Sequence, residues 1–122
     1  MIYKKLTLYF CANKQVMYKK GDFVVLASNI ADGVFTSAFT NCTNLTSVSF
    51  PNLTSVGDST FYSAFTNCTN LTSVSFPKLT SVFSSSFSKI GHSNLTIHVP
   101  SSLSSAGLST DGSEYGTIVY DL

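Results

Sequence analysis

Charged residues are scarce in this chain of 122 residues, and their scarcity limits its possible partners. Only 11% of the residues are Asp, Glu, Lys or Arg, and the formal net charge is +1. Nucleic acid or an anionic membrane surface calls for a concentrated basic face, and this composition predicts none. A group of lysines near the N-terminus is interpreted as solvated charge on capping strands. These are Lys4, Lys5, Lys14, Lys19 and Lys20.

Long apolar runs are missing too. None approaches the roughly 18 residues that a membrane-spanning helix needs, so no membrane insertion is expected. The stretch Leu6–Ala12 follows Lys4 and Lys5, as the apolar part of a signal peptide would. It is of minimal length, however, and Thr7 and aromatic residues interrupt it. We therefore predict a strand there and no convincing signal peptide.

Catalytic signatures are lacking as well. The only histidines are His92 and His98, and the acidic residues are scattered along the chain. Serine is abundant, but no GxSxG turn, HExxH helix or phosphate loop accompanies it. The chain is predicted not to be an enzyme, and neither a cofactor nor a metal site is expected.

What the chain does contain is a repeat. The stretch Ser37–Val56 returns as Ser63–Val82 at an offset of 26 residues, and the only change is Asn52 to Lys78. A fixed period of this size is typical of a solenoid, in which successive coils stack. Ten Phe and six Tyr supply the apolar surface that disordered chains lack.

Each coil is predicted to begin with a strand and a proline turn. Leu45, Val48 and Phe50 point inward, with serines between them pointing outward, and Pro51 ends the strand because proline cannot donate to a sheet. A second short strand follows the proline. Stacked coils should therefore form two parallel ladders.

The return segment, Gly57–Cys68, is predicted to be partly helical. Its apolar residues Phe61, Phe65 and Cys68 are three or four positions apart, which favours one or two helical turns against the core. The preceding Asp58-Ser59-Thr60 offers oxygens to cap such a helix.

The three cysteines, Cys11, Cys42 and Cys68, are an odd number without a CxxC pair, which favours neither a metal site nor a disulfide framework. Cys42 and Cys68 occupy the same repeat position, so stacking would place them about 4.8 Å apart. Parallel side chains rarely reach the dihedral angle of a disulfide. We predict a ladder of buried, reduced thiols.

The ends depart from the repeat. Alternating residues in the range 1–20 predict a β-hairpin that caps the first coil, and Ile97 should lie on Val74 in the last repeat. The segment Tyr115–Leu122 is predicted to be a closing strand. The chain is thus one domain, with an N-terminal cap over residues 1–26, repeats over 27–100 and a C-terminal cap over 101–122.

Six Asn-x-Ser/Thr sequences accompany the repeat. We interpret them as ladders of side-chain amides that bond loop backbone, since glycosylation would matter only in a eukaryotic secretory setting. The asparagines are Asn41, Asn44, Asn52, Asn67, Asn70 and Asn94.

The order Leu-Thr-Ser-Val-Ser-Phe-Pro, Leu-Thr-Ser-Val-Gly and Ala-Phe-x-x-Cys resembles the BspA-like leucine-rich repeats of bacterial surface antigens, over about residues 27–100. Leu95–Leu103 and Tyr115–Val119 look like that family's tail. The resemblance implies a leucine-rich repeat solenoid, β-rich with short helical turns. It would have right-handed coils of about 26 residues and capped ends. It also implies a cell-surface or secreted protein.

Two functions follow as hypotheses. In the first, the strand face is an interaction surface for a protein or a glycan, as solenoid faces commonly are, in a bacterial surface or adhesion role. Its residues are Ser47, Ser49, Ser73, Ser75, Thr96 and His98. In the second, the domain is a structural spacer or tip of a larger surface or phage-like assembly without its own ligand. We prefer the first hypothesis, although the face lacks the aromatic and Arg residues that dominate binding energies, which weakens the first and strengthens the second.

Two further expectations concern partners and specificity. The sequence is compatible with a homo-oligomer. Specificity is expected where the repeat breaks, at Gly91–His98 or in the N-terminal hairpin.

Overall fold

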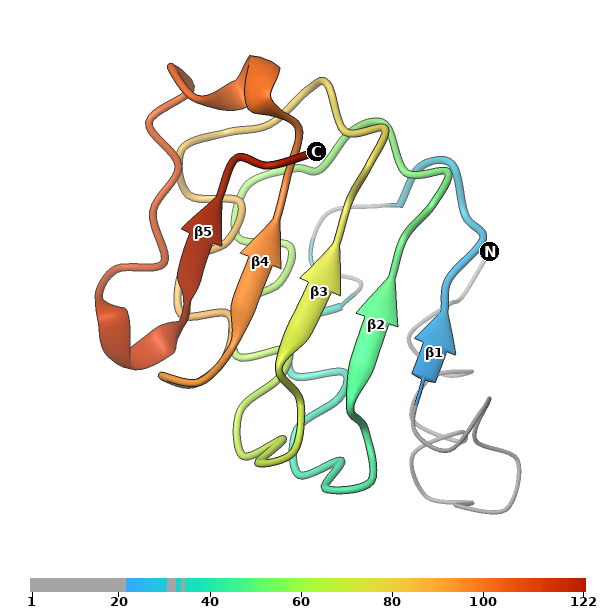
Figure 1. Ribbon diagram of the computed structural model, residues 1–122, viewed down its shortest axis with the longest axis vertical. Helices are drawn as coiled ribbons and strands as arrows, with labels where there is room; N and C mark the ends of the chain where they lie inside the picture. Colours follow the sequence, from blue (N-terminus) through green and yellow to red (C-terminus); the bar gives the residue numbers. More distant parts are fainter. Residues whose placement is uncertain (1–21, 31–32, 34) are drawn as a thin grey trace.

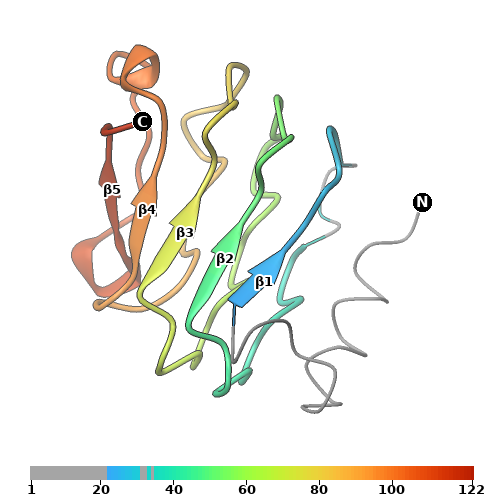
Figure 2. The same cartoon turned by 45° about the vertical axis from the view of Figure 1, so that its right-hand side comes forward.

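A computed structural model describes residues 22–30, 33 and 35–122, so the predicted N-terminal hairpin lies outside the described residues. Five short parallel strands form one sheet in chain order (Figure 1). Seen from the side, the chain returns behind the sheet after each of the first four strands (Figure 2). The strands are β1 Asp22–Val24, β2 Ser47–Ser49, β3 Ser73–Ser75, β4 Thr96–His98 and β5 Thr117–Val119. The predicted solenoid of stacked coils is confirmed.

The register follows the repeat. Val48 pairs with Val74, and Val74 pairs with Ile97, as predicted. Along the chain, the paired positions from β1 to β5 are 25, 26, 23 and 21 residues apart. From β2 onward the coils therefore shorten toward the C-terminus while the sheet remains in register, and the returns absorb the difference.

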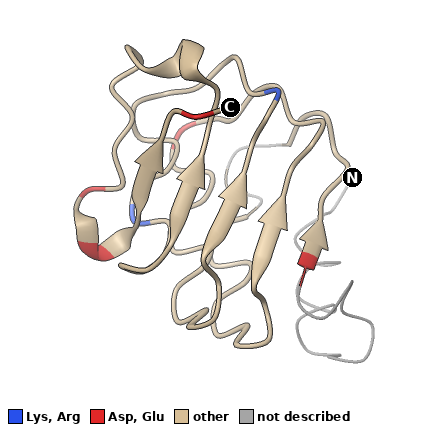
Figure 3. Cartoon of the chain, viewed as in Figure 1, with Lys and Arg blue, Asp and Glu red and all other residues tan. Residues whose placement is uncertain are grey.

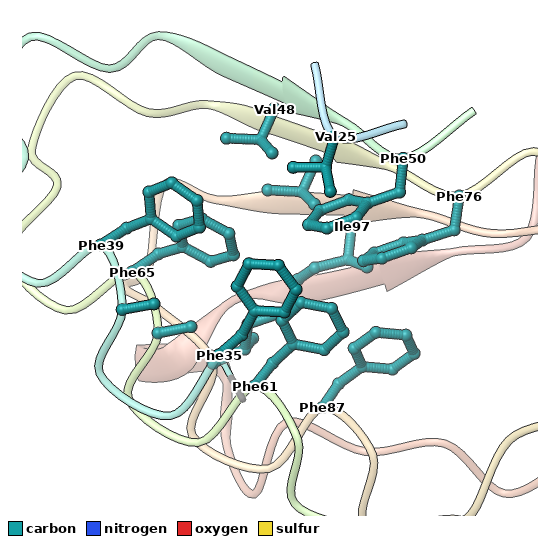
Figure 4. Packing of buried hydrophobic residues seen from close by; sticks show 14 of the residues in the cluster. Val25, Phe35, Phe39, Val48, Phe50, Phe61, Phe65, Phe76, Phe87 and Ile97 are labelled. Atoms are coloured by element: carbon teal, nitrogen blue, oxygen red, sulfur yellow. The ribbon is translucent and has the colours of Figure 1, made fainter. Parts of the chain in front are cut away.

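The core is built from phenylalanine ladders between the sheet and the returns (Figure 4). The Phe61 ring stacks between Phe35 and Phe87, with centroids 5.6 and 5.8 Å away. The other ladders are Phe39–Phe65 at 5.1 Å and Phe50–Phe76 at 4.8 Å. All of these rings are at most 1% exposed. Stacked and edge-on aromatic pairs of this kind add about 0.5–1.5 kcal/mol each beyond the burial of their area.

The return segment is a chain of turns, so the predicted helix at Gly57–Cys68 is wrong. Peptide N–H groups bond alternately within and between coils. Ala64 N–H donates to Phe61 O at 2.9 Å, whereas Phe65 N–H donates to Ile90 O of the next coil at 2.8 Å. The second kind of bond takes the donors that an α-helix would use internally. Phe61, Ala64 and Phe65 still face the core, because successive turns place apolar residues at the same spacing.

Left-handed residues make these turns possible. Ser37, Ser63 and Lys89 occupy one position of three successive coils with φ of 55°, 54° and 49°, and Asn41 and Asn67 follow the same rule at 67° and 62°. Positive φ breaks a right-handed helix, and Asn tolerates it better than most residues. The predicted cap also fails, since Asp58 accepts hydrogen bonds from Ser59 and Ser85 rather than from helix peptides.

Side-chain hydrogen bonds tie adjacent coils at the loops, and for Asn52 and Asn70 they are the predicted amide bonds to loop backbone. Asn52 Nδ2 donates to Leu26 O at 3.2 Å, and Asn70 Nδ2 donates to Thr43 O at 2.7 Å. Behind the proline turn the second predicted ladder shrinks to one parallel bridge, Ser55 with Ser81. Peptide groups still bond between coils there, since Val56 N–H donates to Ser81 O and Thr80 N–H donates to Thr54 O, both at 2.9 Å.

The cysteines differ from the predicted ladder of reduced thiols. Cys42 is disulfide-bonded, so that prediction is wrong for it. Cys68 is free and fully buried, and its Sγ donates to Phe39 O at 2.8 Å. Burial raises the pKa of the Cys68 thiol to about 11. A thiol in that state is a small apolar side chain rather than a nucleophile.

The C-terminal end is the least regular part. It contains the 3-10 helices η3, Ser101–Leu103, and η4, Ser113–Tyr115, before β5, which is the predicted closing strand. Leu122 fixes the end of the chain, because its N–H donates to Val99 O and its O accepts from Ser101 N–H.

Candidate interaction face on the parallel sheet

The sheet register brings the six predicted face residues together in two rows. Ser47, Ser73 and Thr96 form the first row by direct pairing. Ser49, Ser75 and His98 form the second. Each of these side chains is half-buried, while the residue between them on each strand is buried in the core. Neighbours in a row are about 4.8 Å apart, the spacing of adjacent strands.

Both rows continue onto the outer strands. Asp22 and Thr117 extend the first row at its two ends. Val24 and Val119 extend the second. Hydroxyl groups therefore occupy the middle of the face. The outer strands add the carboxylate of Asp22 and the apolar side chains of Val24 and Val119.

The β1 corner is acidic. Ser47 Oγ donates to Asp22 Oδ1 at 2.7 Å, and Thr46 Oγ1 lies 3.4 Å from the same oxygen. These contacts orient the carboxylate and occupy one of its oxygens. Asp22 was not among the predicted face residues, although the register that placed Ser47 on the face implies its position.

The opposite corner is a His–Asp pair. His98 Nδ1 lies 3.0 Å from both carboxylate oxygens of Asp121, and the two side chains are 27% and 46% exposed. His98 pairs with Ser75, as predicted, and so replaces a small hydroxyl by a ring at the rim. Asp121 was missed because it follows the closing strand, where no repeat indicates the position of a side chain.

His92 does not join His98. It precedes β4, whereas His98 ends that strand. Its Nδ1 accepts a hydrogen bond from Asn94 N–H at 3.3 Å, and its Nε2 is buried without a described partner. The break at Gly91–His98 thus places its two histidines at opposite ends of one strand, and only His98 contributes to the face.

The side chains of the face offer hydrogen-bonding groups. Its hydroxyls can each donate and accept, which suits peptide groups and sugar hydroxyls. Among the described residues, no group of three His, Cys, Asp or Glu could hold a metal ion. The two lysines of the described part, Lys78 and Lys89, lie off the strands (Figure 3). The face is therefore polar and nearly uncharged between its two acidic corners.

Stacked coils, parallel strands and buried ladders of this kind define a leucine-rich repeat solenoid, a fold that is typically a non-enzymatic interaction scaffold. The family model of the BspA type leucine rich repeat region, in six copies, matches residues 28–64 and 36–110. The chain belongs to that family. No curated protein and no solved structure matches it significantly. Within the described part of the chain, no helix is long and apolar enough to cross a membrane.

Proposed function

We propose that this domain is a non-enzymatic interaction module that binds a protein or a glycan through its strand face at a bacterial cell surface. The observation that carries the proposal is the pair of in-register rows, Ser47–Ser73–Thr96 and Ser49–Ser75–His98. Hydroxyls at regular spacing can bond a partner whose own polar groups repeat, such as a sugar chain or an extended peptide.

The location at the surface has separate support. Cys42 is disulfide-bonded, and disulfides persist in secreted and surface proteins but are rare in a reducing cytosol. Membership in a BspA-type family points the same way.

A second function is favoured by what the face does not offer. The middle of the two rows holds serines alone, without the Trp, Tyr or Arg side chains that usually dominate binding energy. A spacer or tip domain of a larger surface or phage-like assembly needs only a rigid, soluble stack. This alternative predicts no saturable ligand for the strand face.

The experiment compares two isosteric variants. Val24 and Val119 already occupy the second row, so Ser49→Val with Ser75→Val fits the sheet and removes two hydroxyls. Ser49→Thr with Ser75→Thr has the same shape but retains them. Wild type and both variants are screened against a glycan array and immobilised extracellular proteins, and each hit is titrated by surface plasmon resonance.

If the domain is an interaction module, the wild type should show saturable binding, and the Thr variant should retain it. The Val variant should bind about fivefold or more weakly, since two unmade hydrogen bonds cost about 1 kcal/mol or more in total. Equal affinities for the Val and Thr variants would place the ligand elsewhere. No saturable ligand for the wild type in either screen would favour the spacer.

A further inference from the structure

The sheet ends in an edge that no described residue pairs. Thr117 N–H donates to Leu95 O, and Val119 O accepts from Val99 N–H, so both residues bond toward β4. In a parallel strand the alternate residue directs its peptide groups the other way. The N–H and C=O of Ile118 therefore point outward from β5, where an added strand would bond to them.

A groove with an apolar floor lies beside this edge. Its volume is about 360 Å³, and Leu108, Ile118 and Tyr120 contribute the apolar side chains among its lining residues. The same three side chains pack against the core but are only partly buried. Ile118 belongs to the inward row through its pairing with Ile97, which is fully buried. The groove is thus the uncovered end of the solenoid core.

The rim of the groove is acidic. Asp111 and Glu114 are exposed and adjoin the lining residues Thr110, Gly112 and Ser113. Figure 3 shows these acidic positions around η4, next to β5. Lys89 of the preceding coil also reaches this end, where its Nζ lies 5.8 Å from the centre of the Tyr115 ring. Residues 101–122 contain three acidic side chains and no lysine.

The opposite end of the chain has the complementary charge. Residues 1–21 contain five lysines and no acidic residue, and they lead into β1, the other edge of the sheet. Charges of opposite sign at the two ends of a stack favour the contact of one end with the other. Leu6, Leu8 and Phe10 of that segment alternate with less apolar residues, the pattern of a strand that could add to an edge.

We propose that the β5 groove docks the lysine-rich residues 1–21 of a second copy of this chain, so that the domains associate head to tail. The added segment bonds to the outward peptide groups of Ile118, covers Leu108 and Tyr120, and places its lysines near Asp111 and Glu114. Such a contact joins two different surfaces and leaves a free end on each copy. It therefore builds an open row rather than a closed dimer.

The first test is the mass of the wild-type protein in solution. Sedimentation velocity is recorded from about 5 to 200 µM at low salt and again at about 0.5 M NaCl, where charge pairs are screened beyond a few Å. The proposal predicts species at multiples of the 13.1 kDa chain that grow with concentration and decline in salt. A monomer at every concentration would overturn it.

Two charge-reversed variants locate the contact. Ser113→Lys with Glu114→Lys makes the groove basic, and Lys14→Glu, Lys19→Glu and Lys20→Glu makes the N-terminal segment acidic. Each variant alone should associate at least tenfold more weakly than wild type. A control variant adds the same charge as the groove variant at three exposed positions, through Asn44→Lys, Asn52→Lys and Thr69→Lys. The next coil already has a lysine, Lys78, at the position of Asn52. This control should associate as wild type does.

Mixing the two reversed variants separates contact between chains from a segment that folds back onto its own groove. An equal mixture pairs each acidic segment with a basic groove, and each basic segment with an acidic groove, so association should return. A mixture that stays monomeric overturns the proposal. Circular dichroism checks the fold, and if the groove variant melts below wild type, Asp111→Asn with Glu114→Lys replaces it in the mixture, because Asn tolerates the positive φ at position 111. Because these substitutions avoid the strand face, the outcome is independent of ligand binding there.

Discussion

The two middle coils and the last coil differ in what their side chains contact. In the coils of β2 and β3 several contacts are copies of the ones below: Phe61 stacks on Phe35 as Phe87 stacks on Phe61, and Thr80 Oγ1 donates to Thr54 O as Thr54 Oγ1 donates to Ser28 O. The last coil has contacts that occur once. Thr110 Oγ1 lies within hydrogen-bonding distance of two carbonyl oxygens, Gly112 O and Gly116 O, and His98 pairs with Asp121.

The repeated contacts account for the stability of the stack, whereas the single contacts distinguish one coil from another. A repeated contact stabilises every interface between coils, so near-identical sequences are what a stack selects. A contact that occurs once is not multiplied along the stack, although a single one, such as the disulfide of Cys42, can still stabilise it. The corner at His98 and the groove beside β5 belong to this second kind, and both lie where the sequence departs from the repeat.

The largest effect is expected in the middle coils. Phe65→Ala removes a fully buried ring that stacks on Phe39 at 5.1 Å and lies 6.5 Å from Phe61. It should lower the free energy of unfolding by about 3–5 kcal/mol, because both the transfer of the ring and the remaining cavity count. Urea titration followed by circular dichroism measures the loss.

Phe83→Ala is the control from the end of the regular region. Its ring is 58% exposed, so the same substitution should change stability by less than about 0.5 kcal/mol. Similar losses for the two variants would mean that the ladder does not concentrate the stability in the middle coils.

The strands and the core of these coils could be predicted from sequence because two signals agree there. Alternation of apolar residues with serine fixes which side of each strand is buried, and the fixed period fixes which residues pair. Together they predict that Ile97 lies on Val74 and His98 on Ser75, and the sheet contains both pairs. Agreement of local pattern with global stacking is what makes such a region predictable.

The return segments and the corners of the face were harder to predict from the sequence, for physical reasons. Phe61, Ala64 and Phe65 have the spacing of a helix, but a series of turns buries the same residues, and Ser63 at φ 54° carries no glycine signal for it. Cys42 and Cys68 share a repeat position, yet Cys42 is disulfide-bonded and Cys68 is free. Neither the alternation of apolar residues with serine nor the repeat period predicts a contact that one coil makes and the next does not.

A loss of stability of intermediate size is expected when a left-handed turn is disturbed. Ser63→Val forces a β-branched residue to adopt φ near 54°, which should cost about 1–2 kcal/mol, whereas Ser63→Gly should be tolerated much better. Ser49→Val makes the same substitution on β2 and should stay within about 0.5 kcal/mol, since strands favour valine. Thermal melts of the three variants rank them. Equal melting temperatures for the two Val variants would contradict a left-handed turn at Ser63.

The smallest effect is expected at the last coil, where His98→Ser imports the residue that the middle coil has at the paired position, Ser75. The variant loses only a partly exposed pair with Asp121, which should contribute about 0.2–1 kcal/mol and less at high salt. A double-mutant cycle with Asp121→Asn isolates the pair from the loss of each side chain alone. A coupling above about 2 kcal/mol, unchanged by salt, would make this corner a structural clasp and remove the contrast with the middle coils. A small coupling leaves His98 and Asp121 at the rim of the face with little structural role, so that either side chain can be substituted without unfolding the stack.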